Sequence, residues 1–295
     1  MSKRLKVERP PFIRVDESLI IEGDSSFVLP RLADRSVQMI VTSPPYWGLR
    51  DYGIDGQVGL EQSLDQFINR LVSLFAEARR ILRNDGTFWL NIGDGYTSGN
   101  RGWRAPDKKN RGRAMDMRPE TPKGLKPKDL IGVPWRLAIA LQNDGWYLRS
   151  EIIWSKPNCQ PESVKDRPTR AHEHIFMFSK EENYYYDHES VRESTKDGRG
   201  TRNRRSVWEV NTRPFAGGHF AVFPPELIDP CIKAGSRPGD LVLDPFFGSG
   251  TVGEVCQNLE RRYVGIELHP EYVKMAASRL NANEDRILRI GGTAA

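Results

Sequence analysis

Short apolar runs alternate along the chain with segments in which apolar residues recur every three or four positions. The short runs predict buried strands over residues 18–22, 37–41, 87–92, 241–244 and 263–267. The longest periodic segment begins after a capping-box sequence, Ser63 to Gln66, and presents one apolar face. It predicts a helix over 67–82 that Asn84-Asp85-Gly86 ends.

Other segments complete an alternation of strand and helix. Helices are predicted over 25–32, 133–142, 225–234, 251–259 and 270–281, and an antiparallel strand pair over 146–155 and 174–179. No internal repeat is present. The alternation predicts an α/β fold with a largely parallel sheet covered on both faces.

Composition narrows the class of protein. The 295 residues include 44 Lys and Arg against 39 Asp and Glu, a net charge of +5, which permits an acidic partner without requiring one. Three scattered cysteines indicate a reducing compartment. No apolar run approaches membrane-spanning length, and no signal region follows the basic N-terminus, so we expect a soluble cytoplasmic protein.

The strand predicted at 37–41 runs into Thr42-Ser43-Pro44-Pro45-Tyr46-Trp47. Proline donates no ladder hydrogen bond, so the chain leaves the sheet here in a stiff conformation. A hydroxyl, proline carbonyls and two aromatic rings then lie at the carboxyl end of a strand, where open α/β sheets bind ligands. A plain proline turn with packed aromatic residues is the alternative interpretation.

A glycine-rich loop follows the strand at 241–244. The loop, Asp244-Pro245-Phe246-Phe247-Gly248-Ser249-Gly250-Thr251, opens a predicted helix, and Glu267 ends the next strand. This arrangement is typical of a nucleoside site in which the acidic residue binds ribose hydroxyls. Together with Gly253, it also matches the Gly-x-Gly-x-x-Gly dinucleotide fingerprint, so an NAD-dependent oxidoreductase is one alternative. Two features oppose NAD: the unit lies at the end of the chain, and Asp244 suits a cationic or amino-bearing ligand.

Together these motifs resemble the S-adenosylmethionine-dependent amino-methyltransferases of DNA, in their permuted (beta) arrangement. Thr42 to Tyr46 resembles the catalytic motif, and 244–251 resembles the cofactor loop. The resemblance implies a Rossmann-like, seven-stranded, mainly parallel sheet with one antiparallel strand, in a single catalytic domain over 1–295. It also implies a set of cofactor-binding residues: Asp24, Phe220, Pro224, Asp244, Pro245, Phe246, Gly248, Gly250, Thr251 and Glu267.

The same resemblance gives roles to the proline motif. The Ser43 hydroxyl and Pro44 carbonyl would accept hydrogen bonds from an exocyclic amine, held still by Pro44 and Pro45. Tyr46 would stack on a base that has left the duplex, and Trp47 either helps it or packs in the core.

Methylation at cytosine C5 needs a cysteine nucleophile, but Cys231 is predicted to be buried in a helix. His172 and His174 are interpreted as structural, and no metal site is predicted.

The substrate expectation rests on Ser43. Members with Ser-Pro-Pro-Tyr usually methylate the cytosine N4 amine, whereas Asp or Asn in place of serine goes with adenine, so N4-cytosine is favoured and N6-adenine stays open. The partners expected are double-stranded DNA, a cognate restriction endonuclease and a second copy in a homodimer. A DNA-binding module without catalysis is a further alternative.

Two basic segments are the expected DNA contacts. Residues 96–128 hold ten Lys or Arg and three Asp or Glu, and 181–216 contain an arginine-rich stretch. The first is predicted to clamp the DNA backbone and the second to recognise the target, although solvated loops are the alternative. The candidate DNA-binding residues are Trp47, Arg104, Lys108, Lys109, Arg111, Arg113, Arg199, Arg202, Arg204 and Arg205.

Overall fold

The structure is a computed structural model that describes residues 12–13, 15–98, 119–213 and 223–291. Its centre is one sheet with strand order β11-β1-β10-β9-β2-β3-β5-β4-β8. In chain order these strands are β1 (Leu19–Glu22), β2 (Val37–Thr42), β3 (Leu82–Ile92), β4 (Tyr147–Ser155), β5 (His172–Ser179), β8 (Val207–Glu209), β9 (Leu241–Asp244), β10 (Arg262–Glu267) and β11 (Ile287–Arg289).

Only β5 runs against its neighbours in this sheet, pairing antiparallel with both β3 and β4. Without the three-residue edge strands β8 and β11, seven strands remain, which confirms the expected sheet with one antiparallel member. From β9 the chain continues to one neighbour, β10, and from β2 it continues to the opposite one, β3. The junction of β9 and β2 is therefore the topological switch point.

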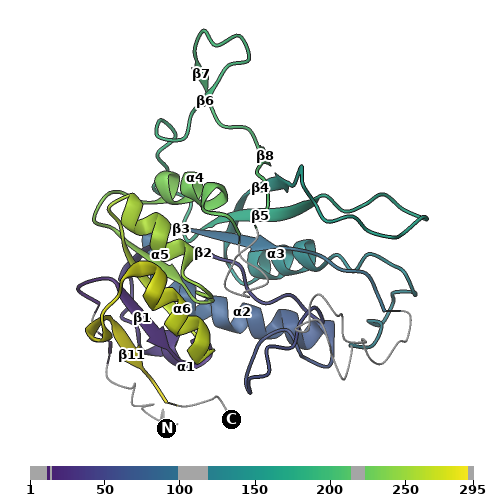
Figure 1. Cartoon of the computed structure of the whole chain (residues 1–295), viewed down its shortest axis with the longest axis horizontal. Helices are drawn as coiled ribbons and strands as arrows, with labels where there is room; N and C mark the ends of the chain where they lie inside the picture. Colours follow the sequence, from purple (N-terminus) through teal and green to yellow (C-terminus); the bar gives the residue numbers. More distant parts are fainter. Residues whose placement is uncertain (1–11, 14, 99–118, 214–222, 292–295) are drawn as a thin grey trace, which may run out of the picture.

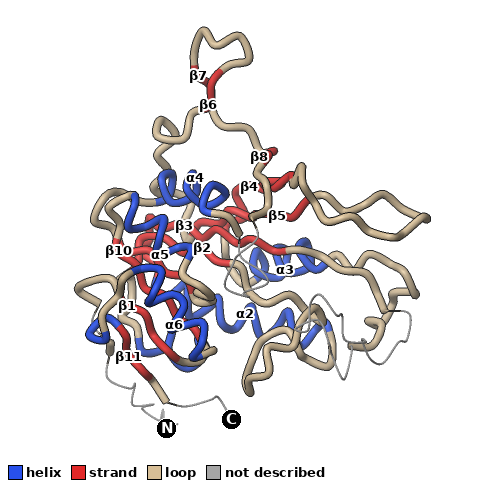
Figure 2. Tube along the Cα trace, viewed as in Figure 1, coloured by secondary structure: helices blue, strands red, loops and turns tan. Residues whose placement is uncertain are grey.

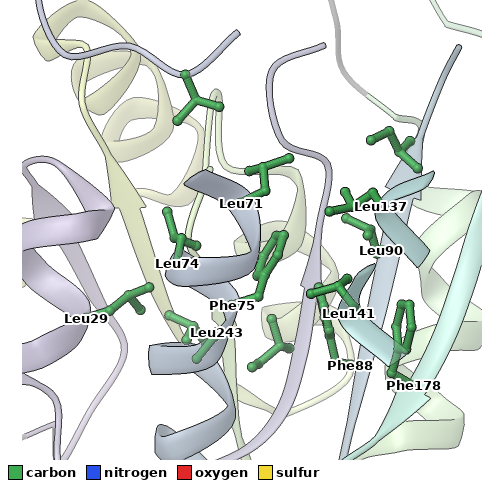
Figure 3. Close-up of a cluster of buried hydrophobic side chains, with 14 of the residues drawn as sticks. Leu29, Leu71, Leu74, Phe75, Phe88, Leu90, Leu137, Leu141, Phe178 and Leu243 are labelled. Carbon is green, nitrogen blue, oxygen red and sulfur yellow. The ribbon is translucent and has the colours of Figure 1, made fainter. Parts of the chain in front are cut away.

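Helices cover both faces of the sheet (Figures 1 and 2). One face packs against α1 (Ser25–Val28), α2 (Leu64–Ile81) and α3 (Val133–Asn143), and the other against α4 (Pro225–Gly235), α5 (Thr251–Asn258) and α6 (Pro270–Leu280). Figure 3 shows part of the first core, where Phe75 of α2 meets Phe88 of β3 with ring centroids 4.7 Å apart. Burial of these apolar side chains stabilises the packing of the helices on the sheet whose edge forms the site.

The helix α2 begins with the predicted capping box. The Ser63 side chain accepts from the Gln66 backbone N–H, and the Gln66 side chain accepts from the Ser63 N–H. The prediction that Asn84-Asp85-Gly86 ends this helix was wrong, because α2 ends at Ile81 and these residues lie inside β3. Leu82 pairs with Val37 of β2, and an irregularity in the register accommodates the extra residues.

The segment 181–216 was expected to be irregular, but part of it is ordered as strands. A hairpin of β6 (Glu193–Ser194) and β7 (Thr201–Arg202) projects from the body of the molecule at the top of Figure 1. The chain then returns as β8, which pairs parallel with β4 and extends the sheet. The polar sequence around β8 does not by itself predict a strand. The strand forms because the open edge of β4 offers partners for its backbone hydrogen bonds.

Candidate active site

The candidate site lies along the edge formed by the carboxyl ends of the parallel strands. Asp24 follows β1, Glu267 ends β10, Asp244 ends β9 and Ser43 follows β2. These strands are neighbours in that order, so three of the predicted cofactor residues, Asp24, Glu267 and Asp244, form a continuous row with the proline motif. The row crosses the switch point between β9 and β2, where α/β sheets of this type bind their ligands.

A buried hydrogen bond joins the two predicted motifs. Thr42 Oγ1, at the end of β2, donates to Asp244 Oδ1 at 2.5 Å, and both residues are almost fully buried. The Phe246 backbone N–H donates to the same carboxylate oxygen at 3.0 Å, closing the turn after β9. The cofactor loop and the proline motif therefore share one rigid contact.

Two acidic side chains in this row have raised pKa values. Burial raises the pKa of Asp244 to about 7, although the hydrogen bond from Thr42 opposes the shift. Burial also raises the pKa of Glu267 to about 7, against the backbone donors that favour its charged form. Two of those donors are the N–H groups of Gly248, at 2.7 Å, and His269, at 2.8 Å. A cationic ligand, or one that donates hydrogen bonds from hydroxyl groups, would stabilise the charged form of such buried carboxyl groups.

The loop after β9 adopts the tight conformation that its glycines permit. Gly248 and Gly250 have φ of 52° and 83°, and a Cβ on Gly250 would contact Ala276 at 3.1 Å. Pro245 accepts a hydrogen bond from the Ser25 hydroxyl, and Thr251 begins α5. The loop is thus tied to the segment after β1. Asp24 caps α1 by accepting from the Ser26 N–H at 2.8 Å, and its second carboxylate oxygen is buried with no partner among the described residues.

These features fit a nucleoside cofactor that carries positive charge. Three acidic groups supply acceptors for ribose hydroxyls and amines, and the free oxygen of Asp24 is an acceptor still to be satisfied. Pro224 is the N-cap residue of α4. Phe220, another of the residues expected to bind the cofactor, lies outside the described residues.

The side chain of Tyr46 lies beside the row of strand ends, against the backbone of β3. A Cβ on Gly93 would approach Tyr46 Cε2 to 2.5 Å, so the ring occupies space that any larger residue would fill. The Tyr46 hydroxyl lies 2.7 Å from Glu173 Oε2 and 3.5 Å from Ser43 Oγ. Burial, followed by the charge of Glu173, raises the pKa of Tyr46 well above its ordinary value, so the phenol keeps its proton.

Sequence reasoning missed the residues that surround this phenol. Glu173 accepts from Asn91 Nδ2 at 3.2 Å and forms an ion pair with Lys156. Asn91 lies on β3, Lys156 follows β4 and Glu173 lies near the start of β5. The sequence around His172 and His174, which were interpreted as structural, gave no indication of a role for Glu173.

Trp47 packs in the core. It is 9% exposed, and its indole N–H donates to the Glu61 carbonyl at 2.9 Å. Of the two alternatives for this residue, the geometry supports packing.

The remaining candidates for other chemistry are buried or paired. Cys231 is fully buried in α4, and burial raises its thiol pKa far above the ordinary value, which does not suit a nucleophile. His174 Nδ1 lies 2.6 Å from Glu151 Oε1. Within the described ranges, no group of three or more His, Cys, Asp or Glu is arranged to hold a metal ion. None of the described helices is long and apolar enough to cross a membrane.

The second basic segment presents its arginines unequally. Arg202 and Arg205 both pair with Glu193 across the hairpin, and the Arg204 guanidinium lies over the Trp208 ring at 4.6 Å from its centroid. Arg199 is exposed in the connection between β6 and β7. The five candidates of the first segment, Arg104, Lys108, Lys109, Arg111 and Arg113, lie outside the described residues.

Fold and site together define an α/β enzyme of the methyltransferase type. Its proline motif follows β2 and comes earlier in the sequence than β9 and the glycine-rich loop after it. The profile of the N6/N4 methyltransferase family, described as DNA methylase, matches residues 37–278. The chain therefore belongs to this family of DNA methyltransferases, and S-adenosylmethionine is its methyl donor. Family membership favours the methyltransferase interpretation over the oxidoreductase.

Individual relatives agree with this assignment. The chain is 66% identical over 285 residues to the type II methyltransferase M.Cfr9I of Citrobacter freundii, covering 97% of this chain and 95% of the relative. It is 61% identical over 262 residues to the type II methyltransferase M.SmaI of Serratia marcescens, covering 88% and 90%. Both relatives are named type II methyltransferases, in agreement with the membership of this chain in the DNA methyltransferase family.

Solved structures support the fold. The structure of the PvuII DNA methyltransferase (cytosine-N4-specific) aligns with a TM-score of 0.67 at 21% identity, covering 92% of each chain. The complex of M1.HpyAVI with SAM aligns with a TM-score of 0.57 at 19% identity, covering 89% of this chain and 99% of that one.

Proposed function

We propose that the protein methylates the exocyclic N4 amine of cytosine in duplex DNA, at a specific sequence, with the target base swung out of the helix. The observation that carries the proposal is the position of Ser43, directly after the strand end that Thr42 joins to Asp244 of the cofactor loop. Family members with serine at this position usually methylate cytosine. The PvuII enzyme named as cytosine-N4-specific has the same overall fold.

The chemistry requires acceptors rather than a nucleophile. The lone pair of a base amine is delocalised into the ring, so acceptors beside its N–H groups favour a tetrahedral nitrogen whose lone pair can attack. The Ser43 hydroxyl and the Pro44 carbonyl are such acceptors, and the two prolines limit their motion. S-adenosylmethionine supplies a methyl group activated by its positively charged sulfur. No covalent intermediate on the protein is needed, in keeping with the burial of Cys231.

Tyr46 is proposed to hold the swung-out base by stacking. Its ring packs on Gly93 and its hydroxyl contacts Glu173, so the ring is held in place before DNA binds. Aromatic stacking on an unpaired base contributes about 1–3 kcal/mol. The proposed catalytic group thus consists of Ser43, Pro44, Pro45 and Tyr46.

The proposed target-recognition segment is 181–216, because the β6–β7 hairpin places arginines away from the body of the molecule (Figure 1). Arginine can donate two hydrogen bonds to a guanine edge in the major groove. The segment 96–128 is proposed to contact the DNA backbone through its positive charge. A cognate endonuclease, a homodimer and a cytoplasmic location remain part of the proposal.

The direct test uses tritiated S-adenosylmethionine with unmodified plasmid DNA, followed by separation of the nucleosides. Label on N4-methylcytosine is the expected result. Label on N6-methyladenine would contradict the base assignment, and absence of transfer would favour a binding module without catalysis. Sequencing of the product by a method sensitive to modified bases then gives the recognition sequence.

Two substitutions test the assigned roles in the same assay. Ser43→Ala removes the hydroxyl acceptor, and Tyr46→Ala removes the stacking face. Each is expected to lower the single-turnover rate of methyl transfer while cofactor affinity stays near that of the wild type. A wild-type rate in either variant would remove the corresponding role.

A further inference from the structure

Glu173 is linked to the proposed acceptor Ser43 by a short chain of hydrogen-bonding groups. Tyr46 lies between them, with its hydroxyl 2.7 Å from Glu173 Oε2 and 3.5 Å from Ser43 Oγ. We propose that Glu173 is a positioning residue that acts through Tyr46, fixing the direction of the hydrogen bond at Ser43 so that Ser43 receives the substrate amine as an acceptor. The inference deepens the proposed function and rests on it.

The direction follows from what each group can donate. Glu173 is held in an ion pair with Lys156, and an ionised carboxylate only accepts hydrogen bonds. Asn91 Nδ2 also donates to it at 3.2 Å, so Glu173 receives donors from three other strand ends. The single proton of the Tyr46 hydroxyl is therefore committed to Glu173, the nearest acceptor.

The lone pairs of the Tyr46 oxygen then face Ser43. The Ser43 hydroxyl can give its proton to this oxygen, which leaves the lone pairs of Ser43 Oγ directed away from Tyr46. The distance of 3.5 Å is at the outer limit of a hydrogen bond, and such contacts often shorten when substrate binds. With the opposite direction, Ser43 would present a proton to the amine and repel it.

Sheet register explains why these groups meet. Glu173 is paired with Trp154 across β4 and β5, and its neighbour His174 is paired with Ile92 of β3. Since β5 is antiparallel, its beginning lies at the edge where β3 and β4 end. The Lys156 ammonium also lies over the Trp154 ring, 4.1 Å from the centroid, which keeps the cation beside Glu173.

The test is a cycle of variants measured as single-turnover transfer of tritiated methyl to unmodified plasmid DNA. Tyr46→Phe and Glu173→Met each remove one link, and each is expected to slow transfer roughly ten- to hundredfold, the effect of losing a hydrogen bond to a charged group. Both substitutions break the same chain of hydrogen bonds from Glu173 to Ser43. The double variant should therefore transfer methyl no more slowly than the slower of the two single variants. In a Ser43→Ala background neither substitution should slow transfer further.

Lys156→Met/Glu173→Met separates positioning from charge balance. It replaces the ion pair by two apolar side chains, which often leaves stability unchanged. The inference expects it to be as slow as Glu173→Met, whereas recovery of the wild-type rate would show that Glu173 only neutralises Lys156 and would overturn the inference. Glu151→Gln, which removes the neighbouring carboxylate paired with His174, is the matched control and should keep the wild-type rate.

Other outcomes are equally decisive. If the effects of Tyr46→Phe and Glu173→Met multiply, or if Tyr46→Phe has the wild-type rate, the inference fails even though N4-methylcytosine is formed. If the product is N6-methyladenine, the base assignment fails, while the cycle still reports on Glu173 through total methyl transfer.

Discussion

Thr42 Oγ1 donates a 2.5 Å hydrogen bond to Asp244 Oδ1, and the two residues are 202 positions apart in the sequence. The bond crosses the junction of β2 and β9, where the proposed amine pocket meets the cofactor loop. A shift of either strand end would therefore be felt by the other. The contact gives the permuted order of motifs a physical meaning, because residues distant in the sequence are neighbours at one sheet edge.

Replacing Thr42 by valine should weaken cofactor binding. Valine keeps the shape but donates no hydrogen bond, which leaves a buried carboxylate oxygen less satisfied, at a cost of about 1–3 kcal/mol. The pKa of Asp244 should rise further, because the hydrogen bond from Thr42 now lowers it. Calorimetry is expected to show roughly tenfold weaker binding of S-adenosylmethionine.

Thr87→Val provides the matched control for this change. Thr87 is also fully buried, and its hydroxyl accepts from the Trp89 indole N–H at 3.1 Å. Its loss should lower the melting temperature and leave cofactor affinity unchanged. Equal affinity losses in the two variants would show that Thr42 acts through general stability.

Cofactor binding should strengthen as pH rises from 6 to 8. The pKa values of Asp244 and Glu267 are both about 7 in the folded protein, above the ordinary range of a carboxyl group, because burial disfavours the charged forms. A sulfonium cation and ribose hydroxyl donors favour the ionised carboxylates, so binding near neutral pH should release protons. Calorimetry in buffers of different ionisation enthalpy measures this release, and Asp244→Asn or Glu267→Gln should reduce it.

The same shifts have the opposite consequence for the ligand-free protein. Between the ordinary carboxyl pKa of about 4 and the folded value, the native state holds more protons than the unfolded state. These two groups therefore make stability fall as pH rises through this interval, and the cost is complete above the folded pKa.

A cofactor affinity that stays constant from pH 6 to 8, with no proton release, would contradict the assignment of both carboxyl groups to the cofactor site.

Gly93→Ala should displace the Tyr46 ring. The added Cβ would lie 2.5 Å from Tyr46 Cε2, closer than atoms can approach, so the ring must move. Misplacing a positioning group by about 1 Å can lower a rate by about a hundredfold. The rate of methyl transfer should fall strongly while cofactor affinity is kept.

The control for this substitution is two residues further along the chain. A Cβ on Gly95 would have its nearest contact at 3.8 Å, with Ile131, so Gly95→Ala should be tolerated. Fluorescence of 2-aminopurine at the target position would show whether Gly93→Ala impairs the stacking of the base. Wild-type transfer by Gly93→Ala would mean that the Tyr46 ring is not held where the structure places it.

Much of the fold was predictable because its signals are local. The capping box of α2, the apolar runs of the central strands and the glycines of the loop after β9 each depend on residues close in sequence. The row of Asp244, Glu267 and Ser43 followed from one further rule, that parallel strands end at the same edge.

What was not predictable depends on pairing between distant strands. Glu173 approaches Tyr46 only because the register of β5 places it opposite Trp154. Strand β8 exists because the free edge of β4 offers backbone partners, which its own three residues do not indicate. The early start of β3 has the same origin, in the pairing of Leu82 with Val37.

Arg199 should contribute to DNA binding more than its neighbours in the hairpin. It is exposed in the connection between β6 and β7, whereas Arg202 and Arg205 are engaged with Glu193 and already serve the hairpin itself. Arg199→Ala should therefore weaken DNA binding with no change in melting temperature. If Arg199 contacts a phosphate, the salt dependence of log K should decrease by about one unit.

Fluorescence anisotropy over a series of salt concentrations measures both quantities. Lys274→Ala is the matched control, because Lys274 is an exposed cation on α6 outside both basic segments, paired with Glu271. If both variants lose affinity equally, the effect is one of net charge, and the hairpin is not the recognition element. If Arg199→Ala also changes which sequence is methylated, Arg199 reads a base edge and not the backbone alone, because phosphate contacts carry no sequence information directly.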